Sequence, residues 1–113
     1  MSQKLPRESR ITRPKEYTQI FQGGKMLKGK YWQVIAKPTT HAGPKLGLAI
    51  SKKVFKLAVE RNRIKRIARE TFRLEKSKLD PWGFVVMARK NQNNNYADLS
   101  NELINLFHKL AKN

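Results

Sequence analysis

The side chains able to do chemistry in this chain are concentrated in one basic segment. Residues 52–73 carry nine Lys or Arg side chains against two Glu. At about 100° per residue, a helix from Glu60 onward puts one polar set on a narrow stripe: Asn62, Lys65, Arg66, Arg69 and Arg73. The opposite side carries an apolar set suited to a core: Ile64, Ile67, Ala68 and Thr71. The stripe therefore predicts a surface for a polyanion.

A basic helix face can also be simply solvated, and that is the ordinary interpretation of a charge run. Solvated helices usually interleave Glu with Lys four residues apart, because such pairs stabilise the helix. This stripe carries no acidic residue, so its charges repel one another and favour a partner that neutralises them. Arg also outnumbers Lys on the stripe, and the planar guanidinium group binds phosphate oxygens in pairs.

The overall composition agrees with a nucleic-acid partner. The 113 residues include 25 Lys or Arg and 8 Asp or Glu, for a formal net charge of +17. The length and the 39% of hydrophobic residues predict a single domain over residues 1–113. We expect residues 1–11 to form a flexible N-terminal arm. It has no Cys and no apolar run long enough for a membrane helix or secretory signal, so we expect a cytoplasmic protein without a membrane role.

The order of predicted elements is helix, three strands, helix, strand, helix. The first helix has Thr12 as its cap and Pro14 in its first turn, and it ends at Gly23 and Gly24. The predicted strands are residues 25–28, 31–37, 46–50 and 84–88. The basic helix begins near Ala58, and the last begins at Ala97 with Asn95 as its cap. This α-β-β-β-α-β-α order predicts an α/β (α+β) two-layer sandwich with one sheet face partly open as a groove.

Catalysis by the protein itself is poorly supported. A two-metal nuclease needs several convergent carboxylates, whereas the eight acidic residues are dispersed along the chain. A metal-free nuclease needs a general base and a general acid, and the two candidates are His41 and His108. We therefore expect no catalytic residue, metal or cofactor on the protein, and Mg²⁺ only with a folded RNA partner.

Two other classes of protein remain open on composition: a structural RNA-binding protein of the ribosomal type, and a duplex DNA binder that lays the helix in a major groove. Against DNA, Asn62 is the only obvious base-reading side chain on the stripe. The RNA that co-purifies with the chain would distinguish a ribosomal protein from other RNA binders.

The segment RNRIKRIARETFR, residues 61–73, resembles the RNR signature helix of the bacterial ribonuclease P protein component. The resemblance extends over nearly the whole chain. It includes PRESRI at residues 6–11, Phe21, LGL at 46–48, SKK at 51–53 and FVVMARK at 84–90, in that family's order. It implies a basic subunit, ribosomal-protein-like in fold, with the RNR helix in a left-handed crossover.

The same resemblance implies a function. The subunit would bind a catalytic RNA, which does the cutting, and the single-stranded 5′ leader of precursor tRNA. It implies a monomer in a 1:1 complex with the RNA. The residues expected to face the catalytic RNA are Arg61, Asn62, Arg63, Lys65, Arg66 and Arg69.

A second set of residues is implied for the leader: Tyr17, Phe21, Lys52, Lys53, Arg89 and Lys90. Aromatic rings suit single strands because every base has a π-face, although Tyr17 and Phe21, four apart on a helix, also fit plain core packing. Many relatives have an aromatic residue on the central strand where Ile35 stands here. Strand alternation would let Tyr31 replace it on the same face.

Overall fold

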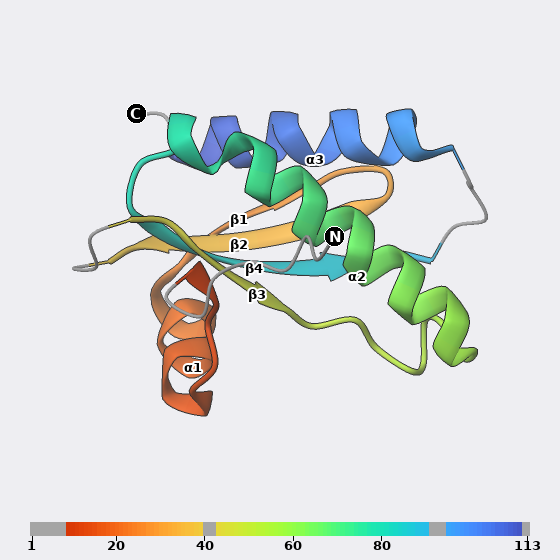
Figure 1. Cartoon of the computed structure of the whole chain (residues 1–113). Coiled ribbons are helices and arrows are strands. Elements are labelled where there is room, and N and C mark those ends of the chain that lie inside the picture. The colour runs from red at the N-terminus through yellow and green to blue at the C-terminus, as the bar shows by residue number, and fades with distance from the viewer. Residues whose placement is uncertain (1–8, 40–42, 91–94, 112–113) are drawn as a thin grey trace.

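A computed structural model describes residues 9–39, 43–90 and 95–111 of the chain (Figure 1). Its helices are α1 (Pro14–Gly23), α2 (Ala58–Glu75) and α3 (Tyr96–Ala111), with a short 3-10 turn, η2 (Lys76–Lys78), after α2. Its strands are β1 (Lys25–Lys28), β2 (Trp32–Pro38), β3 (Lys45–Leu48) and β4 (Trp82–Ala88). The predicted order of helices and strands is confirmed.

The four strands form one sheet in the order β1-β2-β4-β3. β2 pairs antiparallel with β1 and with β4, whereas β3 and β4 are parallel. In Figure 1 both parallel strands run to the right, β3 lies in front of β4, and α2 crosses above the sheet between them. This connection is a left-handed crossover, against the usual preference and as the family resemblance implied.

The main core lies between the sheet and the helices α2 and α3, which cover the same face (Figure 1). Alternate residues of β2 and β4 point into it, among them Trp32, Val34, Phe84 and Val86. The rings of Phe72, Phe84 and Phe107 pack edge to face, with centroids 5.1–6.1 Å apart. α3 buries its predicted apolar side: Leu99, Leu103, Leu106, Phe107 and Leu110.

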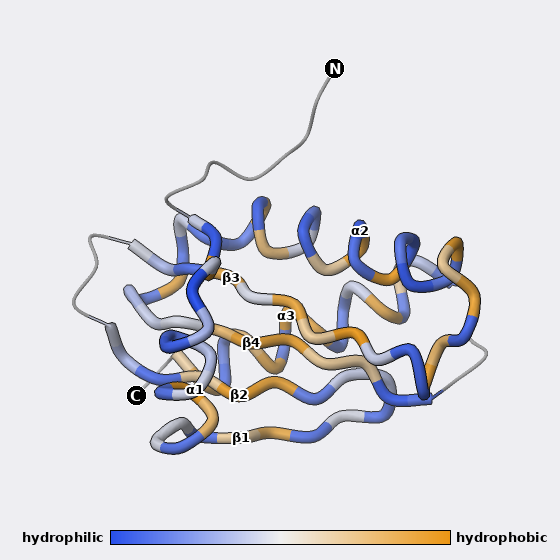
Figure 2. Tube along the Cα trace, turned by 90° about the horizontal axis from the view of Figure 1, so that it is seen from below, coloured by the Kyte–Doolittle hydropathy of each residue, from blue (hydrophilic) through white to orange (hydrophobic). Residues whose placement is uncertain are grey.

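Of the helices that the structure describes, α1 is the one on the other face of the sheet (Figures 1 and 2). Ile20 of α1 packs there with Ile11, Ile35 and Val85 in a small second cluster. Two glycines permit this approach, because a Cβ atom on Gly47 would lie 2.9 Å from the Tyr17 ring, and one on Gly83 would lie 2.9 Å from Ile20 Cδ1. The predicted sandwich, with one face partly open, is therefore confirmed.

The helix caps agree with prediction at one end of the chain and differ at the other. The backbone N–H of Asp98 donates to Asn95 Oδ1 at 3.1 Å, which confirms Asn95 as the cap of α3. The predicted cap Thr12 is wrong, because α1 has Arg13 at this position and no side-chain cap bond. Pro14 at the first helical position already supplies the helical φ angle and has no N–H to satisfy.

Residues 9–11, the last three residues of the predicted flexible arm, are held against the sheet. Arg10 forms a parallel bridge with Leu46, and the Ile11 N–H donates to the Leu46 carbonyl at 2.9 Å. Ile11 is buried. Residues 9–11 therefore lie along the outer edge of β3, where they satisfy part of the exposed strand edge.

Candidate nucleic-acid interface

The amphipathic pattern predicted for α2 is confirmed. Its inner side, with Ile64, Ile67, Ala68 and Thr71, is at most 4% exposed. Thr71 also shares a buried hydrogen bond of 3.0 Å with Ser100 of α3. Across the stripe, Asn62 and Arg66 are exposed and the other three members are half-buried. Figure 2 shows the hydrophilic colour recurring along α2, whereas β4 and the middle of β2 have mainly the hydrophobic colour.

Arg61 has a structural task that its place in the motif did not predict. Its Nη1 donates to the carbonyl oxygens of Phe55 and Lys56, both at 2.9 Å. These bonds tie the segment between β3 and α2 to the first turn of the helix. Two of the expected leader-binding residues, Lys52 and Lys53, lie in that segment. Only the bend of the chain ahead of α2 brings these carbonyls within reach, so sequence spacing carries no signal for the contact.

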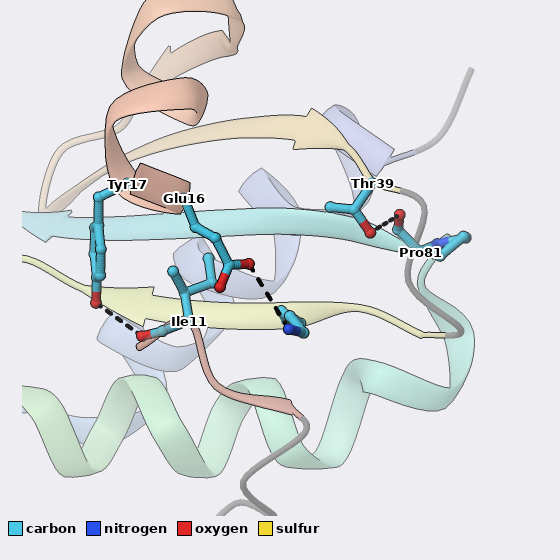
Figure 3. Close-up of polar contacts among 6 residues, drawn as sticks. Ile11, Glu16, Tyr17, Thr39 and Pro81 are labelled. Atoms are coloured by element: carbon cyan, nitrogen blue, oxygen red, sulfur yellow. Dashed lines mark hydrogen bonds and ion pairs between the residues drawn. The ribbon is translucent and has the colours of Figure 1, made fainter. Parts of the chain in front are cut away.

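The two aromatic residues of α1 differ in their surroundings. Phe21 is 45% exposed. Tyr17 is half-buried above Gly47, where its hydroxyl donates to the Ile11 carbonyl and accepts from the Leu48 N–H, both at 3.3 Å. Figure 3 shows the Tyr17 side chain reaching from α1 to Ile11. Tyr17 is therefore partly packed in the core, whereas Phe21 is not.

Beside α1, part of the sheet face is left uncovered. The register places Met26 of β1 next to Ile35 of β2, and Gln33 of β2 next to Met87 of β4. Met26 is 45% exposed, and its sulfur accepts a bond of 2.9 Å from the Gln33 amide. These residues were not predicted from the sequence, although the alternation of side chains along β1 and β2 could have identified them.

The prediction that Tyr31 replaces an aromatic residue on this face is wrong. Tyr31 precedes β2 and packs against the main core. Its N–H and those of Lys30 and Trp32 donate to the carboxylate of Glu102, at 2.6–2.9 Å, so this turn is fixed to α3. Ile35 does lie on the expected face but is 2% exposed beneath α1.

The remaining basic residues expected at the leader site lie past the ends of two strands. Lys52 and Lys53 follow β3, and Arg89 and Lys90 follow β4; all four are exposed. Because β3 and β4 are parallel, their carboxyl ends lie at the same end of the sheet. Arg89 Nη1 also donates to the Gly29 carbonyl at 2.7 Å. The parallel pairing thus places two pairs of cations that are far apart in the sequence past the same end of the sheet.

Only one member of the histidine pair, His108, lies in the part of the chain that the structure describes. His108 Nε2 lies 2.8 Å from Glu75 Oε1, which joins α3 to the end of α2. His41 lies outside the described residues. Within the described ranges, no three His, Asp or Glu side chains gather into a possible metal site. No helix in those ranges is long and apolar enough to cross a membrane.

Comparison with known proteins agrees with these features. The model of the family described as Ribonuclease P matches residues 5–111. The ribonuclease P protein component of Vesicomyosocius okutanii is 47% identical over 110 residues, covering 97% of each chain. That of Vibrio cholerae is 44% identical over 105 residues, covering 92% of this chain and 86% of the other. The solved RNase P protein from Thermotoga maritima superposes with a TM-score of 0.80 at 26% identity, covering 88% of this chain and 96% of that one.

Proposed function

Because the chain belongs to the bacterial ribonuclease P protein family and is a subunit of that tRNA-processing endoribonuclease, we propose how its surfaces divide the work. The exposed side of α2 binds the catalytic RNA. The sheet face beside α1 binds the single-stranded 5′ leader of precursor tRNA. One copy of the protein acts with one RNA, in the cytoplasm.

The observation that carries the first assignment is the basic stripe of α2, which holds no acidic residue. Arg66 is exposed and Arg69 half-buried, whereas Ile67 beside them is 4% exposed. A folded RNA presents mainly phosphate, and guanidinium groups on a rigid helix bind phosphates in a fixed register. Asn62, Arg63 and Lys65 extend this surface. Arg61 has a partly structural role, because it holds in place the segment that carries Lys52 and Lys53.

The second assignment is supported by the exposed ring of Phe21. A single-stranded leader of any sequence can stack on an aromatic ring, and the exposed Met26 adds apolar surface on the sheet face that carries Ile35. The four cations at the carboxyl ends of β3 and β4 lie on the same sheet and suit the leader phosphates. Tyr17 contributes the inner wall of this surface, because its hydroxyl is already hydrogen-bonded to backbone.

The cutting itself is assigned to the RNA. At least three of the described carboxylates have structural partners: Glu102 binds three backbone N–H groups, Glu75 pairs with His108 and Lys78, and Glu16 pairs with Lys45. Groups committed in this way are poorly suited to hold a pair of catalytic metal ions. The Mg²⁺ that phosphoryl chemistry needs is accordingly held by the RNA, and the protein contributes binding and orientation of the substrate.

Reconstitution tests this division. Rigorously RNA-free protein should leave precursor tRNA intact, and adding the catalytic RNA with Mg²⁺ should produce cleavage at the 5′ end. Activity of the protein alone that disappears in a His41→Ala, His108→Ala variant would reverse the assignment. Purification from cells should recover one large non-ribosomal RNA, whereas recovery of ribosomal RNA alone would favour a structural ribosomal role.

A further inference from the structure

A second basic surface lies on the side of α1 turned away from Phe21. A cavity of about 720 Å³ opens there, between α1 and the adjoining ends of β2 and β3. Its described lining includes one carboxylate, Glu16, and five cations: Arg10, Arg13, Lys15, Lys37 and Lys45. Neither Tyr17 nor Phe21 belongs to the lining. None of the five cations belongs to the two RNA-binding sets predicted from the sequence.

The charge of this cavity is only partly neutralised within the described chain. Lys45 Nζ lies 3.7 Å from Glu16 Oε2, and the Lys45 side chain is only 15% exposed. Among the residues that the structure describes, Arg13, Lys15 and Lys37 form no ion pair. Cations gathered in a concave site raise the local concentration of anions, because the protein walls focus the field. The volume lies within the range of sites that bind small ligands, so a phosphodiester segment fits it.

The cavity lies close to the proposed leader surface. Glu16 and Tyr17 are adjacent on α1, and Figure 3 shows their side chains descending on two sides of Ile11. Glu16 faces the cavity, and Tyr17 faces the sheet beside Phe21. In Figure 1 the carboxyl ends of β3 and β4 lie to the right, and α1 lies below the left part of the sheet. A nucleic-acid strand that enters at those ends and crosses the uncovered sheet therefore reaches α1, and the cavity lies on the other side of this helix.

We propose that this cavity binds phosphates of the leader beyond the nucleotides that contact Phe21. The inference rests on the proposed leader surface and adds a second contact to it. Guanidinium and ammonium groups that contact only phosphates bind a nucleic acid strand of any sequence. The contribution of the cavity to leader affinity should therefore depend on leader length and should not depend on leader sequence.

The test uses the reconstituted holoenzyme and two precursor tRNAs, with leaders of about 4 and about 16 nucleotides, the range over which single-strand sites extend. The variant is Arg13→Gln, Lys37→Gln. Its Kd for the long-leader precursor should rise about 2- to 30-fold, the range expected for two screened charge contacts. The salt dependence of log K should weaken by about 0.7 for each phosphate that is no longer bound. The Kd for the short-leader precursor should stay within about twofold.

The matched control removes two charges elsewhere. Lys25→Gln, Lys109→Gln also lowers the net charge by two, and both residues are exposed and outside every proposed surface. This variant should bind both precursors like the unmodified protein. Because Lys37 is half-buried, Arg13→Gln, Lys15→Gln replaces exposed cations only and should reproduce the length-dependent loss even if the first variant folds poorly.

Three results would overturn the proposal: equal loss for both leader lengths, equal loss in the charge control, or weaker binding of the catalytic RNA without precursor. Phe21→Ala is measured alongside. If Phe21→Ala weakens leader binding while both cavity variants have no effect, the cavity proposal alone fails. If Phe21→Ala has no effect on either leader, the proposed leader surface fails first.

Discussion

The two faces of the sheet are covered to very different extents. Among the residues that the structure describes, the face under α2 and α3 contributes to a cluster of nineteen buried residues, which includes three phenylalanine rings packed edge to face. The face under α1 contributes to a cluster of four: Ile11, Ile20, Ile35 and Val85. Outside the smaller cluster, Phe21 and Met26 remain 45% exposed.

This difference separates stability from binding. Burial of apolar area is the main favourable term in folding, and most of that area lies on the α2 and α3 face. The α1 face can therefore leave aromatic and apolar side chains in water at little cost to the fold. Exposed apolar groups among cations are what a single-stranded nucleic acid needs. Substitutions on one face should change stability, and those on the other should change affinity.

The largest expected effect comes from placing a charge in the main core. Ile67→Asp removes a buried side chain and introduces a carboxylate without a partner, so the free energy of unfolding should fall by at least about 3–5 kcal/mol. Urea denaturation followed by circular dichroism measures the change. Arg66→Asp is the control, since the same side chain on the exposed side should change stability by only about 0.5 kcal/mol. A stable Ile67→Asp protein would contradict the assignment of this side as core.

Next is Glu102→Gln, which keeps the shape of the side chain and removes its charge. The carboxylate accepts three backbone N–H bonds that fix the β1–β2 turn to α3. We expect a loss of about 1.5–3 kcal/mol in the free energy of unfolding, as for bonds to a charged group. Lys109→Gln on the same helix should have almost no effect. Equal stability of the two variants would mean that the turn does not depend on this contact.

Phe21→Ala tests the other face. Affinity for leader-bearing precursor tRNA should fall by about 1–3 kcal/mol if a base stacks on the ring, and affinity for mature tRNA should hardly change. Because Phe21 is half exposed, the free energy of unfolding should fall by less than about 1 kcal/mol. Phe72→Ala, a buried ring, should lose about 3–5 kcal/mol of stability. A Phe21→Ala protein as unstable as Phe72→Ala, and equally impaired toward both RNAs, would place Phe21 in the core.

Arg66→Ala, Arg69→Ala tests whether the outer side of α2 binds the catalytic RNA. Each screened contact contributes about 0.2–1 kcal/mol, and the salt slope should weaken by about one unit for each phosphate that the variant no longer binds. Filter binding at several salt concentrations measures both quantities. Folding should stay nearly intact. A variant that unfolds while keeping its RNA affinity would show that the stripe is structural.

Tyr17→Phe has the smallest expected effect and sharpens the contrast with Phe21. The substitution removes only the hydroxyl that links Ile11 to Leu48, so the free energy of unfolding should fall by about 0.5–1.5 kcal/mol. Leader affinity should stay the same, because the ring remains. A selective loss of leader affinity at unchanged stability would instead show that the hydroxyl contacts RNA.

Periodicity identified the elements and their buried sides well. The 3.6-residue pattern placed Ile64, Ile67 and Thr71 inside, because a helix with one apolar side has only one way to bury it. Strand alternation worked less well near an end. It assigned Tyr31 to the face of Ile35, but the strand begins at Trp32, and the bonds to Glu102 hold Tyr31 against the main core. Local pattern cannot report a contact made with a residue about seventy positions away.

The sequence by itself determined that this is a basic single-sheet protein with one amphipathic, basic helix, because charge and hydrophobic period are properties of the chain alone. The tertiary structure decided which side chains share a surface. The parallel pairing of β3 and β4 places four cations past the same end of the sheet: Lys52, Lys53, Arg89 and Lys90. The tertiary structure also committed Arg61 to two backbone carbonyls, left Phe21 open, and formed the cavity behind α1. These arrangements depend on packing between distant segments, which is settled only when the whole core forms.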